Sequence, residues 1–79
     1  MTRQPGQALS PDTALAAELD RALFEDGRTG REVIEIINER GRVTLTGRVG
    51  SHDTRAAAEE IVRQHPGVQT VVNELRVRS

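Results

Sequence analysis

The sequence predicts an α+β fold in which two helices pack on one face of a three-stranded mixed sheet, in the order α-β-β-α-β. Two observations support this prediction. Apolar residues recur at helical spacing in two separate segments, and residues 42–49 between them alternate apolar and polar side chains, as a strand of a one-sided sheet does. With 79 residues, the chain has room for one modest core.

The first helix is expected to begin at Ser10 and Pro11, because serine is a preferred N-cap and proline is favoured at the next position. Gly27 is expected to end this helix in the left-handed conformation. Phe24, the only aromatic residue, is interpreted as core or edge packing. An apolar stripe at helical period supports the helix: Leu15, Leu19, Ala22 and Leu23.

The residues before this helix differ from the rest of the chain. Residues 1–9 are polar, contain proline and glycine, and have no hydrophobic periodicity. Segments of this kind cannot bury enough apolar surface to become ordered. We therefore expect a disordered lead-in over residues 1–9, followed by a single domain over residues 10–79.

Two strands and a tight connection are expected after the first helix. The β-branched run Val33–Ile37 predicts the first strand, and residues 42–49 predict the second. The four residues Asn38–Gly41 are expected to form a type I turn with Gly41 in the left-handed region, rather than a two-residue primed turn. Within the second strand, alternation is expected to place Gly47 against the second helix.

The second helix is expected to begin at Ser51, an N-cap residue, and to end before Pro66, which cannot continue a helix. Gly67 then allows the exit into a third strand over Val68–Arg78. A strand, helix and strand in one sheet favour a right-handed crossover, so the third strand should run parallel to the second. The predicted core consists of Leu15, Leu19, Leu23, Ile34, Ile36, Val43, Leu45, Val49, Ala57, Ile61, Val71 and Leu75.

Composition and spacing argue against several classes of protein. The chain has no cysteine, which rules out disulfides and thiolate metal sites. A net charge of −1 and a single aromatic residue argue against nucleic-acid binding. His52 and His65 lack the partners of a catalytic triad, and the carboxylates are scattered over the predicted helix surfaces. We therefore expect no enzyme activity, no cofactor and no metal site.

The hydropathy pattern bears on where the protein resides. No stretch approaches the ~18 apolar residues of a membrane span. Residues 1–9 also lack the apolar segment of ~7–15 residues that a signal peptide contains. From the sequence we expect a cytoplasmic protein without a transmembrane segment, and peripheral association with the envelope remains open.

Three segments carry a family resemblance: Gly41–Gly47, Pro66–Val68 and Val71–Leu75. Together they resemble the BON domain, a small bacterial module named for osmotically induced and nodulation proteins. The resemblance implies a non-catalytic binding module for phospholipid headgroups or an envelope-related partner, with a link to osmotic stress. Residues of these segments with an expected structural role are Gly41, Gly47, Gly67 and Asn73.

The candidate binding surface is the open face of the sheet. Two glutamates, Glu35 and Glu74, oppose a larger number of arginines there, so this face is expected to be weakly basic. Such a strip suits anionic lipid headgroups, and the alternative is a solvated face balanced by weak ion pairs. The candidate ligand-binding residues are Arg42, Arg48, Arg76 and Arg78, with Thr44 and Thr46 between them.

Two other functions remain open. The first is a protein partner or self-association into an oligomer, through an edge strand of the sheet or through an apolar surface on the open face. A contiguous patch of the apolar residues expected there, Val33, Ile37 and Val72, would indicate such a partner. A BON-containing architecture that also carries a LysM domain binds potassium, so the resemblance also leaves small-ion binding open.

Overall fold

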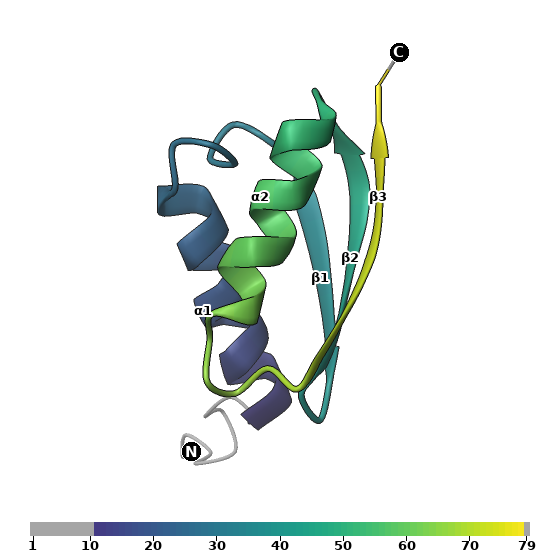
Figure 1. The fold of residues 1–79 in the computed structure, drawn as a ribbon. Coiled ribbons are helices and arrows are strands. Elements are labelled where there is room, and N and C mark those ends of the chain that lie inside the picture. The colour runs from purple at the N-terminus through teal and green to yellow at the C-terminus, as the bar shows by residue number, and fades with distance from the viewer. Residues whose placement is uncertain (1–10, 79) are drawn as a thin grey trace, which may run out of the picture.

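The structure is a computed structural model that describes residues 11–78. It contains two helices and three strands in the predicted order α-β-β-α-β (Figure 1). The predicted N-cap Ser10 and the predicted lead-in over residues 1–9 lie outside the described residues. The elements are α1 (Pro11–Glu25), β1 (Ile34–Glu39), β2 (Arg42–Val49), α2 (His52–Arg63) and β3 (Thr70–Val77).

The three strands form one mixed sheet in the order β1-β2-β3. β1 runs antiparallel to β2, and β3 runs parallel to β2. Both helices lie on the same side of this sheet, with α1 against β1 and α2 against β3 (Figure 1). The predicted α+β architecture is thus confirmed, and the other face of the sheet is open.

The core lies between the helices and the sheet. Val43, Leu45 and Val49 of β2 are fully buried, as alternation along this central strand predicts. Ala58 and Val62 of α2 are also fully buried, although the predicted core omitted both. The other buried apolar residues are Leu19, Leu23, Ile34, Ala57 and Leu75, while Leu15, Ile36, Ile61 and Val71 are partly buried against them.

The connection between β1 and β2 differs from the expected type I turn. Glu39 pairs with Arg42, which leaves only Arg40 and Gly41 in the loop. Both have positive φ, +55° and +90°, as a two-residue type I′ turn requires. The twist of this turn matches that of the paired strands, which explains why it replaces the longer turn. A Cβ on Gly41 would lie 3.1 Å from the Gly67 carbonyl oxygen, so this turn contacts the loop before β3.

The end of α1 also differs from expectation, because Gly27 does not have positive φ. The chain is instead turned by the Asp26 carbonyl, which accepts hydrogen bonds from the amides of Thr29 and Gly30. Thr29 is almost fully buried, and its hydroxyl donates a 2.6 Å hydrogen bond to the Leu23 carbonyl. These bonds satisfy carbonyls at the helix end without a left-handed glycine.

Gly47 has a different role from the predicted contact with α2. Its φ is +132°, a conformation that residues with side chains rarely adopt. A Cβ at this position would lie 2.8 Å from the carbonyl oxygen of Val33, on the segment that leads into β1. The glycine is therefore required by the backbone of the β1–β2 pair and not by the approach of a helix.

Candidate functional site

The open face of the sheet carries rows of side chains that run across the strands, because directly opposed residues share a face. The rows are Glu39, Arg42 and Thr70; Ile37, Thr44 and Val72; Glu35, Thr46 and Glu74; and Arg48 with Arg76. Glu39 thus joins the open face opposite Arg42. The charges on this face are nearly balanced overall, and the positive charge is concentrated at one end.

Two of the four candidate arginines lie apart from the others. Arg42 is at the opposite end of β2 from Arg48, a separation of roughly 20 Å at ~3.3 Å per residue. Arg78 turns toward Glu32, with 3.6 Å between the guanidinium and the carboxylate, and also donates to the Arg48 carbonyl at 3.2 Å. The structure therefore does not bring all four guanidinium groups together.

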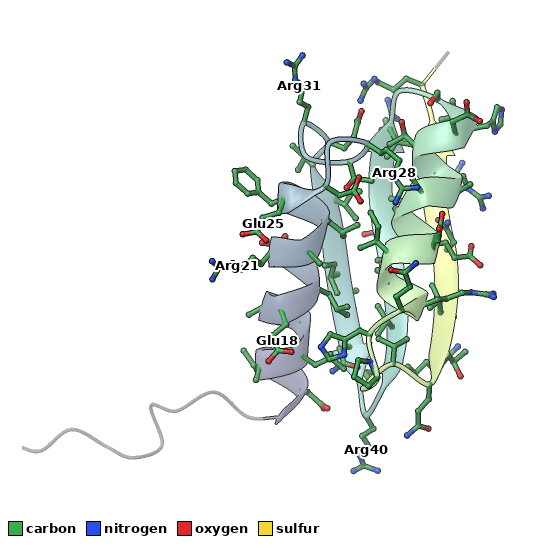
Figure 2. The ribbon with its side chains drawn as sticks, turned by 60° about the vertical axis from the view of Figure 1, so that its left-hand side comes forward. Glu18, Arg21, Glu25, Arg28, Arg31 and Arg40 are labelled. Carbon is green, nitrogen blue, oxygen red and sulfur yellow. The ribbon has the colours of Figure 1, made fainter. Side chains whose placement is uncertain are left out.

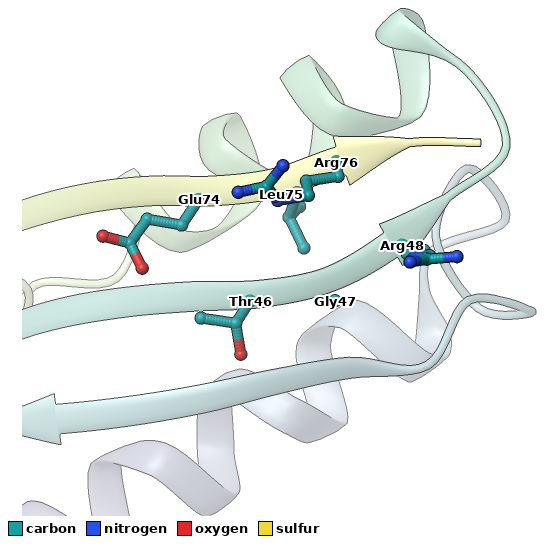
Figure 3. A pocket seen from close by; sticks show the side chains of 6 residues that line it. All are labelled: Thr46, Gly47, Arg48, Glu74, Leu75 and Arg76. Atoms are coloured by element: carbon teal, nitrogen blue, oxygen red, sulfur yellow. The ribbon is translucent and has the colours of Figure 1, made fainter. Parts of the chain in front are cut away.

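Arg48 and Arg76 are register partners on the parallel strands β2 and β3, although their side chains extend in opposite directions along the strands in Figure 3. Both are exposed, and neither forms an ion pair with a carboxylate of residues 11–78. Like charges in this arrangement repel each other. They line a shallow open hollow, shown in Figure 3, together with Thr46, Gly47, Glu74 and Leu75.

Other arginines of the described chain already have partners. Arg21 pairs with Glu25, Arg28 with Asp26 and Glu60, and Arg63 with Glu59. The hydrogen bond from the Arg28 side chain holds the pKa of the Asp26 carboxyl below its ordinary value. The arginine side chains without an ion pair among residues 11–78 are Arg31, Arg40, Arg42, Arg48, Arg55 and Arg76, of which Arg55 donates to backbone carbonyls instead.

The end of the sheet that carries Arg48 and Arg76 also exposes apolar side chains. Val33, directly before β1, is 87% exposed, and Phe24, in the last turn of α1, is 73% exposed. These two residues flank the loop between α1 and β1. Figure 2 shows Arg31 projecting from this loop, at the opposite end of the molecule from Arg40.

The interpretation of Phe24 as a packing residue is wrong. It follows the buried Leu23, and a helix rotates by about 100° per residue. That rotation turns Phe24 away from the apolar stripe and into solvent. Its exposure was missed because an aromatic residue next to an apolar stripe also suits the edge of a core.

The apolar residues Val33, Ile37 and Val72 do not form one patch. Ile37, 48% exposed, shares a row with Val72, but Thr44 lies between them. The row that contains Glu35 and Glu74 separates them from Val33. A contiguous apolar surface on the open face is thus not present among these three residues.

Side chains cap the middle of the outer edge of β3, at Asn73 and Leu75. The backbone N–H and C=O groups of the even-numbered residues of β3 point toward β2, since the Thr70 amide donates to the Gly41 carbonyl. Strand geometry therefore directs the backbone of Asn73 and Leu75 outward. Arg55 of α2 donates to both of these outward carbonyls, at 3.0 Å for Asn73 and 2.9 Å for Leu75.

The Asn73 side chain also contributes to this cap. Its Oδ1 accepts a hydrogen bond from the outward amide of Leu75 at 3.1 Å. Its Nδ2 donates to the Arg55 carbonyl at 3.0 Å and to Glu59 Oε1 at 3.2 Å. Asn73 thus takes the place of a neighbouring strand and ties β3 to α2, which is a structural role.

The two histidines occupy different surroundings. His52 is exposed at the start of α2. His65 Nδ1 accepts a hydrogen bond from the Gly67 amide at 2.9 Å, so its Nε2 carries the proton toward Glu18 Oε1 at 2.6 Å. His65 therefore links α1 to the loop before β3. Within residues 11–78, no group of three or more histidine and carboxylate side chains is placed to hold a metal ion.

Comparison with known proteins agrees with this architecture. A family model described as BON domain matches residues 11–79, nearly the whole chain. The chain belongs to the BON domain family. BON domains are generally non-catalytic binding modules, and phospholipid binding is known in the family.

This BON domain is also similar to a curated protein. It is 36% identical over 66 residues to the "Uncharacterized protein in gshII 5'region" of Anaplasma centrale. The match covers 84% of this chain and 42% of that protein, so it spans less than half the length of this relative. Among residues 11–78 of the BON domain, neither helix has the length and hydropathy needed to cross a bilayer.

Proposed function

We propose that this BON domain binds anionic phospholipid headgroups at the end of the sheet where Arg48 and Arg76 lie. The observation that supports this most is their placement as exposed register partners without a carboxylate partner among residues 11–78. Guanidinium groups recognise phosphate through planar, bidentate hydrogen bonds. A phosphate between the two would relieve their mutual repulsion.

Neighbouring side chains support a membrane surface as the source of the phosphate. Phe24 and Val33 are exposed at the same end and offer apolar contacts to the interface. Arg31 adds a cation without an ion pair among the described residues. Few such contacts give weak and reversible binding, so the domain would associate peripherally with an envelope membrane rather than anchor there.

The test is flotation with vesicles of phosphatidylglycerol and phosphatidylcholine, compared with phosphatidylcholine alone. Each arginine near an anionic surface contributes about 1 kcal/mol. Arg48→Gln/Arg76→Gln should therefore weaken binding to the anionic vesicles by about tenfold or more. Binding of the unchanged protein should also weaken as salt is added, since salt screens exposed charges.

The matched control is Arg40→Gln/Arg42→Gln, which removes the same charge at the other end of the molecule. Arg40 and Arg42 are also exposed and without an ion pair among residues 11–78. This control should retain most of the binding if the site is at Arg48 and Arg76. An equal loss in both variants would contradict the proposed site, and an unchanged protein that ignores anionic vesicles at low salt would contradict the function.

A further inference from the structure

The two outer edges of the sheet differ in whether side chains bond to their outward backbone groups. At the β3 edge, side chains of Arg55 and Asn73 occupy the outward backbone groups of residues 73 and 75. At the β1 edge, no side chain of the described residues forms a hydrogen bond with the backbone of Ile34 to Asn38. An unpaired strand edge is a template for another strand.

The register identifies which backbone groups of β1 face outward. Glu39 and Arg42 flank the two-residue turn and pair directly. In such a hairpin the two flanking residues exchange backbone hydrogen bonds, so the N–H and C=O groups of Glu39 point toward β2. The backbones of Ile34, Ile36 and Asn38 are then directed toward the outer edge.

The charged side chains of β1 itself are acidic, and Arg42 of β2 lies opposite one of them, Glu39. Glu35 and Glu39 are exposed on the open face of β1, and Ile37, 48% exposed, lies between them. On the helix side, Asp20 lies on the side of α1 opposite Glu18, whose contact with His65 marks the side near α2. Asp20 is therefore carried on the side of α1 that faces away from α2. β1 itself contains no cationic residue.

The same carboxylates disfavour a second copy of this chain as the partner. An antiparallel pair of β1 strands would place Glu35 and Glu39 of both copies on one face. Like charges on opposed strands are destabilising. A strand with cationic side chains four residues apart would instead meet Glu35 and Glu39, and an apolar residue midway between them would cover Ile37.

We propose that the outer edge of β1 binds an extended, basic peptide segment, which adds to the sheet as a fourth strand. The main-chain hydrogen bonds are supplied by Ile34, Ile36 and Asn38, and the preference for basic side chains comes from Glu35 and Glu39. This mode of recognition, strand addition at an open edge, derives its affinity from the backbone and its specificity from alternate side chains. It uses residues other than the arginines at the lipid site.

The probe is a fluorescent peptide with arginine at positions i and i+4 and valine at position i+2, so that these three side chains share one face of the added strand. It is matched in length to β1 and blocked at both ends. Fluorescence anisotropy gives its affinity, and amide NMR spectra with hydrogen exchange locate it. We expect shifts and slowed exchange at the amides of Ile34, Ile36 and Asn38. The same peptide with N-methylated edge-facing amides should bind at least tenfold more weakly, because it lacks the hydrogen-bond donors.

Charge variants test the role of the carboxylates. Glu35→Gln/Glu39→Gln should weaken the peptide by about three- to tenfold, as expected for two exposed charge pairs. Asp53→Asn/Glu74→Gln removes two exposed carboxylates elsewhere and should change the affinity by less than about twofold. All four positions are exposed, and circular dichroism will confirm that each variant folds.

Three outcomes would overturn this proposal. Equal binding of the N-methylated peptide would mean that charge alone attracts the probe and that no strand is added. Slow exchange at the β1 edge in the free protein, together with a dimer in sedimentation, would mean that a second copy occupies the edge. Loss of peptide binding in Arg48→Gln/Arg76→Gln would also contradict it, because those residues lie outside β1.

Discussion

Gly47→Val should lower the free energy of unfolding by about 3 kcal/mol or more, the largest effect expected from a single substitution on the sheet. A β-branched residue at φ +132° is strained by about 1–3 kcal/mol. In addition, the new Cβ would lie 2.8 Å from the Val33 carbonyl oxygen, and backbone cannot move aside as a flexible side chain can. Urea unfolding followed by circular dichroism measures the change.

The matched control is Gly27→Ala in the loop after α1. Gly27 has no positive φ, and a Cβ there would have no neighbour within 4 Å. Alanine at such a position restricts the unfolded chain and stabilises by about 0.4–1 kcal/mol. If Gly47→Val unfolds at the same urea concentration as the unchanged protein, the strained β1–β2 geometry described above is incorrect.

Asn73→Ala should lower the free energy of unfolding by about 1–3 kcal/mol, because the outward amide of Leu75 and the Arg55 carbonyl both lose a partner. The substitution should also open the β3 edge. An exposed edge pairs with other chains, so the variant should associate as its concentration rises. Chemical unfolding measures the first effect, and sedimentation velocity at several concentrations measures the second.

Glu74→Gln provides the comparison for Asn73→Ala. Glu74 is exposed on the same strand, and its side chain forms none of the hydrogen bonds or ion pairs found among residues 11–78. Its substitution should change stability by less than about 0.5 kcal/mol and leave the protein at the same size. An Asn73→Ala protein with unchanged stability and unchanged sedimentation would show that the edge does not depend on this side chain.

The two proposed binding surfaces are separable by experiment. Arg48 and Arg76 lie on β2 and β3, whereas Glu35 and Glu39 lie on β1. Arg48→Gln/Arg76→Gln should lose vesicle binding and retain the basic peptide. Glu35→Gln/Glu39→Gln should do the opposite, and an anionic vesicle should bind it at least as well as it binds the unchanged protein.

The amino-acid sequence by itself determined the elements, their order and most of the core. Alternation along residues 42–49 predicts a one-sided strand, and Val43, Leu45 and Val49 are indeed fully buried. Ser51 was predictable as an N-cap, and its hydroxyl accepts a hydrogen bond from the Thr54 amide. These predictions succeed because they depend on local periodicity and local hydrogen bonding.

The candidate site was only partly predictable. Alternation places Arg48 and Arg76 on the open face, but their adjacency depends on the register between β2 and β3, which are separated in sequence by α2. Arg78 turns away from the other arginines because it pairs with Glu32, which lies 46 positions earlier in the chain. Neither relation leaves a signal within a short window of sequence.

The tertiary structure alone decided why Gly47 must be glycine and which sheet edge is open. Each depends on groups that are distant in sequence: the Val33 carbonyl beside Gly47, and Arg55 beside the β3 backbone. Local patterns specify which face of an element is apolar. Only the packed chain determines which backbone groups have found partners, and hence which edge remains available for binding.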